Sequence, residues 1–375
     1  MKIIAFYLPQ FHAIPENDEW WGEGFTEWVN VKKATALFEN QYQPRIPLNE
    51  NYYNLLDDNV KLWQVNLAKE NGIYGFCFYH YWFNGHMLLE KPTAQFLNNK
   101  ELDIPFCLSW ANEPWTKAWV SKNDAVLIEQ EYGREKEWEE HFDYLIQFFK
   151  DPRYIKNNGK PLFVIYRPEQ IECLNEMLDF WQELAQKAGL PGIDFAYQHI
   201  TFDLLEDKDD SRFKYNIEYE PCYALNNYLS SSKKSIMNFM KKIDDILFYL
   251  FKRKLSEFYL TNVRKYSYDE IWKSSINHKP ENEKCIPGAF VDWDNTPRRG
   301  SKGVAYTGAN PEKFEKYLIQ KIEKAKIEYK SDMMFLFAWN EWAEGGYLEP
   351  DDKFKDGYLK AVKNALMKTD EFPNK

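Results

Sequence analysis

The sequence predicts an α/β protein, a single (β/α)8 barrel of the TIM type, and two observations support this fold class. Short apolar segments alternate along the chain with longer amphipathic segments, which is typical of a parallel sheet covered by helices. Eight apolar segments occur, and eight parallel strands favour a closed barrel over an open sheet. Because 375 residues suit one such barrel, we expect residues 1–375 to form a single catalytic domain.

The predicted strands are mostly continuous apolar runs, as expected for strands that are buried on both faces. They cover residues 2–8, 72–79, 104–110, 161–166, 194–198, 214–219, 285–291 and 333–339. The predicted helices repeat apolar residues at helical spacing. They cover residues 56–70, 136–149, 171–188 and 311–325. Pro311 suits the first turn of the last helix, where a backbone N–H would have no partner within the helix.

Two segments are longer than a minimal barrel requires. Residues 10–54 form a long loop after the first strand, and loops of this length usually carry function. Residues 230–275 form an insertion between the sixth and seventh strands, with an amphipathic helix flanked by basic residues at 240–254. Such a helix either packs on the barrel or lies on an anionic membrane surface. Peripheral contact of residues 240–254 with the inner membrane is therefore one expectation.

Composition excludes several classes of protein. The net charge of −10 argues against a nucleic-acid partner. No apolar stretch reaches the ~20 residues needed to cross a bilayer, and the N-terminal apolar run ends at Pro9 without a cleavage site. The five cysteines are scattered and form no C-x-x-C pair, so we expect reduced thiols in a cytoplasmic protein. Aromatic residues make up 18 % of the chain. Their side chains either fill the core or line a long cleft.

The end of the last predicted strand carries the clearest chemical signal. The apolar run stops at Asn340. Glu341 follows between two tryptophans, and Glu344 comes after the second of them. Glycosidic bonds are cleaved by a proton donor and a second carboxylate, and apolar walls raise the pKa of one of the two. Tryptophan also packs well on sugar rings. We therefore predict that Glu341 and Glu344 are the catalytic residues of a carbohydrate-active enzyme.

The ends of the other predicted strands carry polar and aromatic residues as well. In this fold the active site lies at the C-terminal ends of the strands, so these residues should form one ring around a substrate. The chain has no H-E-x-x-H, G-x-G-x-x-G, Walker or G-x-S-x-G motif, so we expect neither a metal nor a cofactor. The predicted substrate-binding residues are Tyr7, Gln10, His12, Trp28, Tyr79, His80, Tyr81, Trp110, Asn112, Glu113, Tyr166, Arg167, His199, Glu220, Asp292, Trp293, Asp294, Asn340 and Trp342.

Several motifs resemble those of WbsX-type proteins, which are described as glycoside hydrolase family 99-like and are associated with lipopolysaccharide O-antigen or capsule biosynthesis. The similarity extends from residue 1 to about residue 358. The matching motifs are A-F-Y-L-P-Q-F-H at 5–12, I-P-E-N-D at 14–18, W-W-G-E-G-F-T-E-W at 20–28, G-F-C-F-Y-H-Y-W-F at 75–83, S-W-A-N-E-P-W at 109–115, W-D-N-T at 293–296 and W-N-E-W-A-E at 339–344.

This resemblance implies a (β/α)8 barrel and retaining, endo-acting cleavage of α-mannosidic bonds, in which the 2-hydroxyl of the sugar attacks. Glu341 would accept the proton of that hydroxyl, and Glu344 would protonate the leaving group. The resemblance also implies that six residues line the sugar subsites. They are Tyr7, Tyr79, His80, Trp110, Asn112 and Glu113.

Two other functions stay open at this point. A glycosyltransferase of O-antigen or capsular polysaccharide biosynthesis would use the helix at 240–254 to stay near the membrane, although the D-x-D candidates at 207–209 and 292–294 are poor. A non-catalytic glycan-binding barrel would not need both glutamates. In each case the expected partner is an oligosaccharide or polysaccharide.

Overall fold

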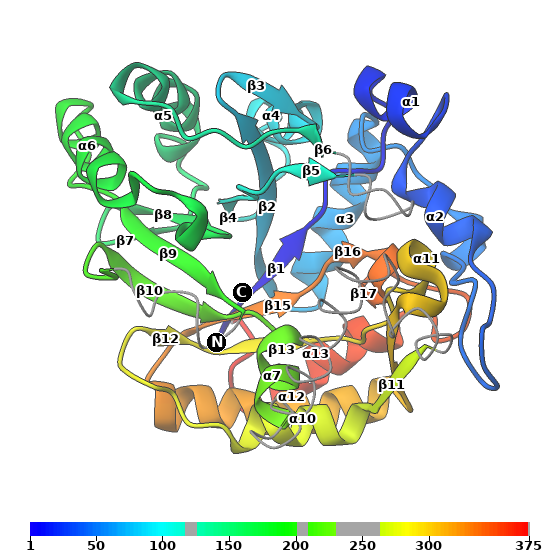
Figure 1. Ribbon diagram of the computed structural model, residues 1–375. Helices are drawn as coiled ribbons and strands as arrows, with labels where there is room; N and C mark the ends of the chain where they lie inside the picture. The colour runs from blue at the N-terminus through cyan, green and yellow to red at the C-terminus, as the bar shows by residue number, and fades with distance from the viewer. Residues whose placement is uncertain (117–125, 201–208, 230–262, 374–375) are drawn as a thin grey trace, which may run out of the picture.

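The computed structural model describes residues 1–116, 126–200, 209–229 and 263–373. In this part of the chain, parallel strands form a barrel in which consecutive strands are neighbours (Figure 1). The barrel strands are β1 (Lys2–Tyr7), β2 (Ile73–Phe83), β4 (Phe106–Trp110), β8 (Lys160–Ile165), β9 (Asp194–His199), β10 (Phe213–Glu218), β12 (Cys285–Ile286) with β13 (Gly288–Phe290), and β15 (Met333–Phe337). The predicted fold class is thus confirmed.

The barrel closes at the seventh strand, which Pro287 divides into β12 and β13. Strand β12 pairs with β10, and β13 pairs with β15, so the two short pieces join the ends of the sheet. A side chain at Gly288 would place its Cβ only 1.8 Å from the backbone oxygen of Glu218. Glycine is therefore required where the two strands approach each other most closely.

The helices lie outside the strands and cover the barrel (Figure 1). Their bounds are α3 (Asp58–Glu70), α4 (Glu90–Asn98), α5 (Glu135–Phe149), α6 (Leu174–Lys187), α7 (Cys222–Tyr228), α10 (Tyr268–Asn277), α12 (Pro311–Lys324) and α13 (Gly357–Lys368). Asn310 caps α12 by accepting a hydrogen bond from the backbone N–H of Lys313, and Pro311 occupies the first turn, as predicted. The four predicted helices correspond to α3, α5, α6 and α12 within three residues at each end.

The predicted insertion at 230–275 is described only from residue 263 onward. Its last part belongs to α10, which packs against α7 and α12 as an ordinary barrel helix. The amphipathic segment at 240–254 lies outside the described residues. Among the described helices, none is long and apolar enough to cross a bilayer.

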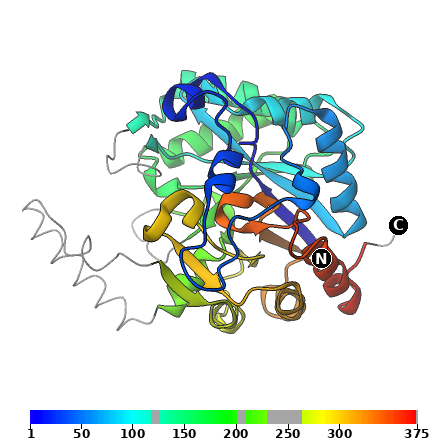
Figure 2. The ribbon, with the colours of Figure 1, turned by 90° about the vertical axis from the view of Figure 1, so that its right-hand side faces the viewer.

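The long connection after β1 folds over the C-terminal ends of the strands. It contains α1 (Pro15–Trp21), α2 (Glu27–Lys33) and the short turn η1 (Leu48–Glu50). Figure 2 shows this segment in dark blue beside α11 (Thr296–Arg299) and the orange segment that follows β15. The smaller strands are β3 (His86–Leu88), β5 (Trp115–Thr116), β6 (Val126–Ile128), β7 (Lys156–Asn157), β11 (Arg264–Ser267), β14 (Val304–Thr307), β16 (Asn340–Glu341) and β17 (Gly346–Tyr347).

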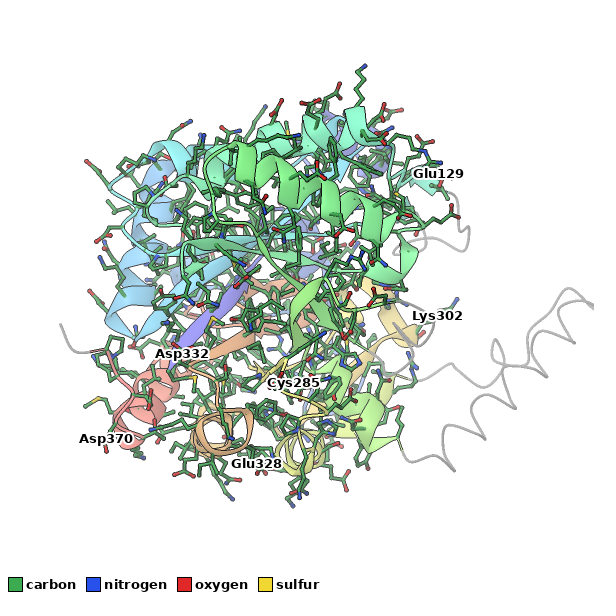
Figure 3. All side chains as sticks on the ribbon, turned by 90° about the vertical axis from the view of Figure 1, so that its left-hand side faces the viewer. Glu129, Cys285, Lys302, Glu328, Asp332 and Asp370 are labelled. Carbon is green, nitrogen blue, oxygen red and sulfur yellow. The ribbon has the colours of Figure 1, made fainter. Side chains whose placement is uncertain are left out.

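The two ends of the barrel are easy to distinguish in Figure 3. Asp332 immediately precedes β15 and lies at the N-terminal end of the barrel strands, whereas Glu129 and Lys302, in the connections after β4 and β13, lie at the opposite end. The long connection and the loops that follow β4, β13 and β15 therefore meet at one end of the barrel, where a site is expected.

Candidate active site

An open cavity, of about 580 Å³ when the solvent at its mouth is included, lies at the C-terminal ends of the barrel strands. Its walls come from segments that follow most of the strands, so residues far apart in the sequence face the same space. The described residues that line it are Leu8, Gln10, Tyr79, Tyr81, Ala111, Glu113, Trp115, Tyr166, Tyr219, Arg298, Glu341 and Glu344. Both predicted catalytic glutamates are therefore in the cavity, together with five of the predicted binding residues.

Asn340 fixes the start of the segment that carries the two glutamates. Its Oδ1 accepts a hydrogen bond from the backbone N–H of Leu8 at 2.7 Å, and its Nδ2 donates one to the backbone oxygen of Leu8 at 3.0 Å. The amide thus continues the pairing of β1 with β15 beyond the last ladder residue. This clamp positions Glu341 directly above the end of β15.

A tight turn then brings Glu344 back to the same cavity. Strands β16 and β17 pair in antiparallel fashion across η6 (Trp342–Glu344), and Gly345 adopts a φ of 74° in this turn. A Cβ at Gly345 would also lie 2.9 Å from the guanidinium of Arg45. The side chain of Trp342 stacks on Tyr347 with 3.8 Å between ring centroids. Trp342 therefore anchors the turn through packing rather than lining the cavity.

Arg298 joins the two glutamates to a third carboxylate from the long connection. Its Nη1 donates to Glu344 at 2.7 Å, its Nη2 to Glu341 at 3.2 Å and its Nε to Glu27 at 3.1 Å. The side chains of Arg298, Glu27 and Glu341 are each only about 6 % exposed or less. One cation thus holds three carboxylates, of which Glu344 is the most exposed, at 18 %.

Burial is the largest influence on the pKa values of both glutamates. It raises the pKa of Glu341 to about 8, and the nearby charges of Glu344 and Glu27 act in the same direction, whereas Arg298 opposes them. Burial also raises the pKa of Glu344, again against the attraction of Arg298. Since charged forms are disfavoured away from water, the pair retains a proton at neutral pH. Such a pair can serve as both acid and base.

Tyrosine side chains form much of the remaining wall. The hydroxyls of Tyr79 and Tyr219 lie 2.8 Å apart, and Phe6 packs below both rings. The hydroxyl of Tyr81 accepts a hydrogen bond from Nε2 of Gln10 at 3.0 Å. Such hydroxyl groups and ring faces can recognise the alternating polar and apolar surfaces of a sugar.

Glu113 adds a third carboxylate to the cavity, on the segment after β4. Burial raises its pKa, and Nη1 of Arg167 lies 3.4 Å from its carboxylate. Asn112 holds this region through two hydrogen bonds with the backbone of Arg167, at 2.7 and 2.8 Å. Asn112 and Arg167 therefore position the loop without lining the cavity themselves.

The alternation of side chains along β2 explains why only some predicted residues reach the cavity. Tyr79 and Tyr81 line it, whereas His80 points the other way and contacts His141 of α5, with 2.9 Å between their Nε2 atoms. Burial lowers the pKa of His80 to about 3. Trp110 lies in the same layer and donates from its Nε1 to the backbone oxygen of Trp82 at 3.1 Å.

Tyr7 illustrates the same effect on β1. Its hydroxyl donates to Gln64 of α3 at 2.6 Å, and Gln64 in turn donates to Glu349 at 2.7 Å. Trp28 packs beside Trp342 in the same region, with 5.5 Å between ring centroids. These residues support the turn from behind, and the structure does not bring them to the cavity.

Other predicted residues hold the loops around the cavity. Asp292 pairs with Arg45 at 2.7 Å, and Asp294 accepts a hydrogen bond from Gln41 at 2.8 Å, so both tie the long connection to the segment after β13. Glu220 accepts a hydrogen bond from the backbone N–H of Ala224 at 2.8 Å. The remaining predicted residues outside the cavity lining are His12, His199 and Trp293, of which His12 is buried and His199 packs on Tyr223.

The sequence prediction missed several residues of the site. Trp115 and Tyr219 line the cavity and come from strand-end motifs, so the signal that identified their neighbours could have found them. The pairing of Arg298 with Glu27 left no signal in the sequence, because the two positions are 271 residues apart. In the described residues, no group of three or more histidine, cysteine or acidic side chains is arranged to hold a metal ion.

The comparisons with known proteins identify the family of the chain and structures with the same fold. The family model described as "Glycosyltransferase WbsX" matches residues 3–362. The WxcX proteins from two strains of Xanthomonas campestris pv. campestris are 32 % identical over 97 % of this chain. The chain spans about half the length of these curated relatives, 49 % in each case.

Two solved structures share the fold at low sequence identity. A family 99 endo-α-mannosidase from Bacteroides thetaiotaomicron has a TM-score of 0.51 and 14 % identity, covering 98 % of this chain and 97 % of that chain. A protein titled "Glycoside hydrolase-like protein" has a TM-score of 0.56 and 13 % identity, covering 97 % and 93 % of the two chains. Because the family model matches nearly the whole chain, this protein belongs to the WbsX family.

Proposed function

We propose that this protein is a carbohydrate-active enzyme whose barrel cleaves or transfers a glycosidic bond with Glu341 and Glu344. The observation that supports this most strongly is the arrangement of the pair: both carboxylates line one tyrosine-walled cavity and both contact Arg298. Cleavage of a glycosidic bond requires one carboxyl group that donates a proton and a second carboxylate that is ionised. This pair holds one proton between its two carboxylates near neutral pH.

We assign the roles by the family 99 resemblance. Glu341 takes the proton of the sugar's 2-hydroxyl, whose oxygen bonds to the anomeric carbon as the bond to the leaving oxygen breaks. Glu344 gives its proton to that leaving oxygen. Glu344 then accepts a proton from a water molecule that attacks the anomeric carbon, and Glu341 returns its proton to the 2-oxygen. Each of the two steps inverts the configuration at the anomeric carbon, so the overall reaction retains it, as in an α-mannosidase of the endo-acting type.

The roles require that the single proton of the pair reside on Glu344. Burial raises the pKa of both glutamates, and Glu341 is the deeper of the two, with 6 % of its side chain exposed against 18 % for Glu344. A sugar hydroxyl that donates a hydrogen bond to Glu341 stabilises its ionised form, because hydrogen bonds to a carboxylate lower its pKa. Substrate binding thus shifts the proton to Glu344, where the leaving group needs it.

The charge of the cavity favours a neutral glycan over a sugar nucleotide. Among its described lining residues, Arg298 is the cation, and Glu113, Glu341 and Glu344 are carboxylates. A diphosphate group would meet net negative charge there. The description of the family as a glycosyltransferase nevertheless supports that activity as the second candidate function. A non-catalytic glycan-binding barrel would give no reason for two glutamates with raised pKa values.

One experiment separates these functions. The protein is incubated with a panel of α-mannosides, and released sugar is measured. Separate reactions contain UDP-, GDP- or dTDP-sugars with and without a glycan acceptor. Release of sugar supports the hydrolase, release of nucleotide only with acceptor supports the transferase, and binding without either supports the glycan-binding barrel.

Contact of residues 240–254 with a membrane is a separate proposal. It rests on the amphipathic pattern with basic flanks in the sequence. Flotation of the protein with vesicles that contain anionic lipid tests it, and vesicles of neutral lipid serve as the control. Equal recovery from both vesicle types would contradict a contact that depends on the basic residues.

A further inference from the structure

Glu349 is a buried carboxylate to which the proposed reaction gives no role. The residue is 2 % exposed, and it follows shortly after the turn that carries Glu341 and Glu344. Its backbone N–H donates to the backbone oxygen of Trp339, just beyond the end of β15, at 3.4 Å. Because a buried carboxylate is costly unless its oxygens accept hydrogen bonds, its partners show what it holds in place.

Side chains from separate segments donate hydrogen bonds to this carboxylate. Oε2 of Glu349 accepts from Nε1 of Trp342 at 2.7 Å and from the hydroxyl of Tyr53 at 2.8 Å. Oε1 accepts from Nε2 of Gln64 at 2.7 Å. Trp342 belongs to the catalytic turn, Tyr53 to the long connection and Gln64 to α3. Glu349 therefore joins the turn to two other parts of the chain.

The hydrogen-bonding capacity of these partners requires an acceptor at Glu349. An indole N–H can only donate. The amide oxygen of Gln64 already accepts from the hydroxyl of Tyr7 at 2.6 Å, so this amide presents its N–H to Glu349. The hydroxyl of Tyr53 accepts from Nδ2 of Asn340 at 3.5 Å and donates its own proton to Glu349. An ionised carboxylate, which only accepts, fits these donors, whereas a protonated one would place a further donor among them.

The network reaches the catalytic turn at two points. Trp342 lies between the two glutamates in the chain, and the hydrogen bond from its Nε1 fixes the orientation of the ring that packs under the turn. Tyr53 contacts Asn340, whose amide clamps the start of the same turn. Loss of these contacts would let the glutamates move, and small displacements of a catalytic group lower the rate steeply.

Glu349 is reached from a cavity other than that of the active site. Glu349 and Trp342 line an open cavity together with residues of η1 and α3, including Trp63. This cavity and the one that contains the glutamate pair share no described lining residue. A proton can therefore reach Glu349 without passing through the substrate cavity.

Few titratable groups act on Glu349. The hydroxyls of Tyr7 and Tyr53 are the nearest, and burial raises the pKa of each, so both stay neutral. Burial raises the pKa of Glu349 to about 7, while the hydrogen bonds that it accepts lower it. The other charged residues in the described lining of its cavity lie at exposed or half-buried positions and are Glu50, Lys355 and Asp356.

We propose that Glu349 is a positioning residue, which in its ionised form fixes Trp342 and thereby the turn that carries Glu341 and Glu344. The inference rests on the proposed function, because it assigns Glu349 an effect on turnover. Protonation of Glu349 weakens the hydrogen bond from Trp342 and lets the glutamates move. Since Glu349 does not line the substrate cavity, the loss falls on kcat and not on KM.

A resonance of Trp342 tests the contact without any substrate. The intact protein carries isotope-labelled tryptophan, and the indole N–H resonance that disappears in Trp342→Phe is followed by NMR against pH. We expect this resonance to shift with a midpoint near 7. The side chain in Glu349→Gln accepts at one atom and donates at the other, as a protonated carboxyl does, so the resonance should stay at its low-pH position throughout.

Turnover tests the consequence for the reaction. On a substrate identified by the glycoside panel, Glu349→Gln should lower kcat at least ~10-fold and keep KM within ~3-fold, because a displaced catalytic group costs rate and not binding. Trp342→Phe keeps an aromatic ring without the N–H and should also lose kcat. Because the two residues act as one unit, the double variant should lose no more than the larger single loss.

Asp151→Asn is the matched control, because Asp151 is a buried carboxylate that accepts from Arg153 and Lys100 ahead of β8, at the other end of the barrel. It should change neither the resonance nor kcat, and thermal unfolding should show that each variant is folded. A resonance that does not titrate, one that titrates equally in Glu349→Gln, an unchanged kcat of Glu349→Gln, or additive losses in the double variant would overturn the inference. No turnover of any substrate by the intact protein would instead overturn the proposed function, and the resonance would still decide whether Glu349 fixes Trp342.

Discussion

Arg298 donates a 2.7 Å hydrogen bond to Glu344 although the two residues follow different barrel strands, β13 and β15. The same guanidinium reaches Glu341 at 3.2 Å. The pair of glutamates is therefore held by a residue from the neighbouring loop, and not by its own turn alone. This relationship helps to fix the geometry of the candidate active site, and the charge of Arg298 opposes the effect of burial on the protonation of the pair.

Replacing either glutamate by its amide should abolish most of the activity. Glu341→Gln and Glu344→Gln keep the shape of the side chain but can neither release nor accept a proton, so turnover should fall ~10²-fold or more. Initial rates on a substrate identified by the glycoside panel measure this effect. Glu328→Gln is the control, since Glu328 lies in η5 (Ala325–Tyr329), which leads into the N-terminal end of β15 (Figure 3). Full activity of either active-site variant would contradict the assignment.

Activity should decline in alkaline solution. The pair needs one proton for the leaving group, and the last proton is lost as the pH rises through about 8, the pKa of Glu341. The profile of kcat/KM against pH should therefore show an alkaline limb near that value. A profile that stays flat up to pH ~10, where tyrosine titrates, would show that no proton of this pair is needed.

Two substitutions should move the alkaline limb in opposite directions. Arg298 lowers the pKa of Glu341, so Arg298→Gln should raise this pKa and move the limb to higher pH. The charge of Glu27 raises the same pKa, so Glu27→Gln should move the limb to lower pH. The pH profiles of the two variants provide the measurement. Shifts in the same direction would indicate a structural effect in place of the electrostatic one.

Loss of the Asn340 clamp should destabilise the fold. Asn340→Ala removes both hydrogen bonds with the backbone of Leu8 and leaves a buried N–H and a buried carbonyl without partners, at a cost of about 1–3 kcal/mol each. Urea unfolding monitored by tryptophan fluorescence measures the loss. Asn364→Ala, an exposed asparagine of α13, should stay within about 0.5 kcal/mol of the intact protein.

Closure of the barrel should depend on Gly288. Gly288→Ala would place a methyl group 1.8 Å from the backbone oxygen of Glu218, so β10 and β13 would have to separate. We expect loss of cooperative unfolding or a large drop in the thermal midpoint. Ala289→Gly in the same strand introduces no clash and should cost only about 1–2 kcal/mol, from backbone freedom and the loss of one buried methyl group. Equal stability of the two variants would contradict the close approach of these strands.

The fold could be predicted because barrel strands and helices leave local patterns in the sequence. Strands buried on both faces are continuous apolar runs, and the outer helices repeat apolar residues at helical spacing, as α12 shows with its buried Phe314, Leu318 and Ile322. Caps such as Asn310 followed by Pro311 mark helix starts within a few residues. The choice of the C-terminal ends of the strands as the site followed from the fold class.

The residues that line the cavity could be predicted only in part. Near a strand end, neighbouring residues point in opposite directions, and the sequence does not reveal which of Tyr79 and His80 faces the interior. The prediction therefore included Tyr7, His80 and Trp110, whose side chains contact the helix layer instead. Residues beyond the strands, such as Asp292 and Asp294, turned out to hold loops together.

By itself, the sequence determined the barrel, the end of the barrel that carries polar residues, and the candidate glutamate pair, because each of these depends on residues that are close in the chain. The tertiary structure alone decided that Arg298 and Glu27 complete this pair and that Glu349 joins its turn to α3. Ion pairs and buried hydrogen bonds join segments from opposite parts of the sequence, and their partners are chosen only when the strands close and the long connection folds over their ends.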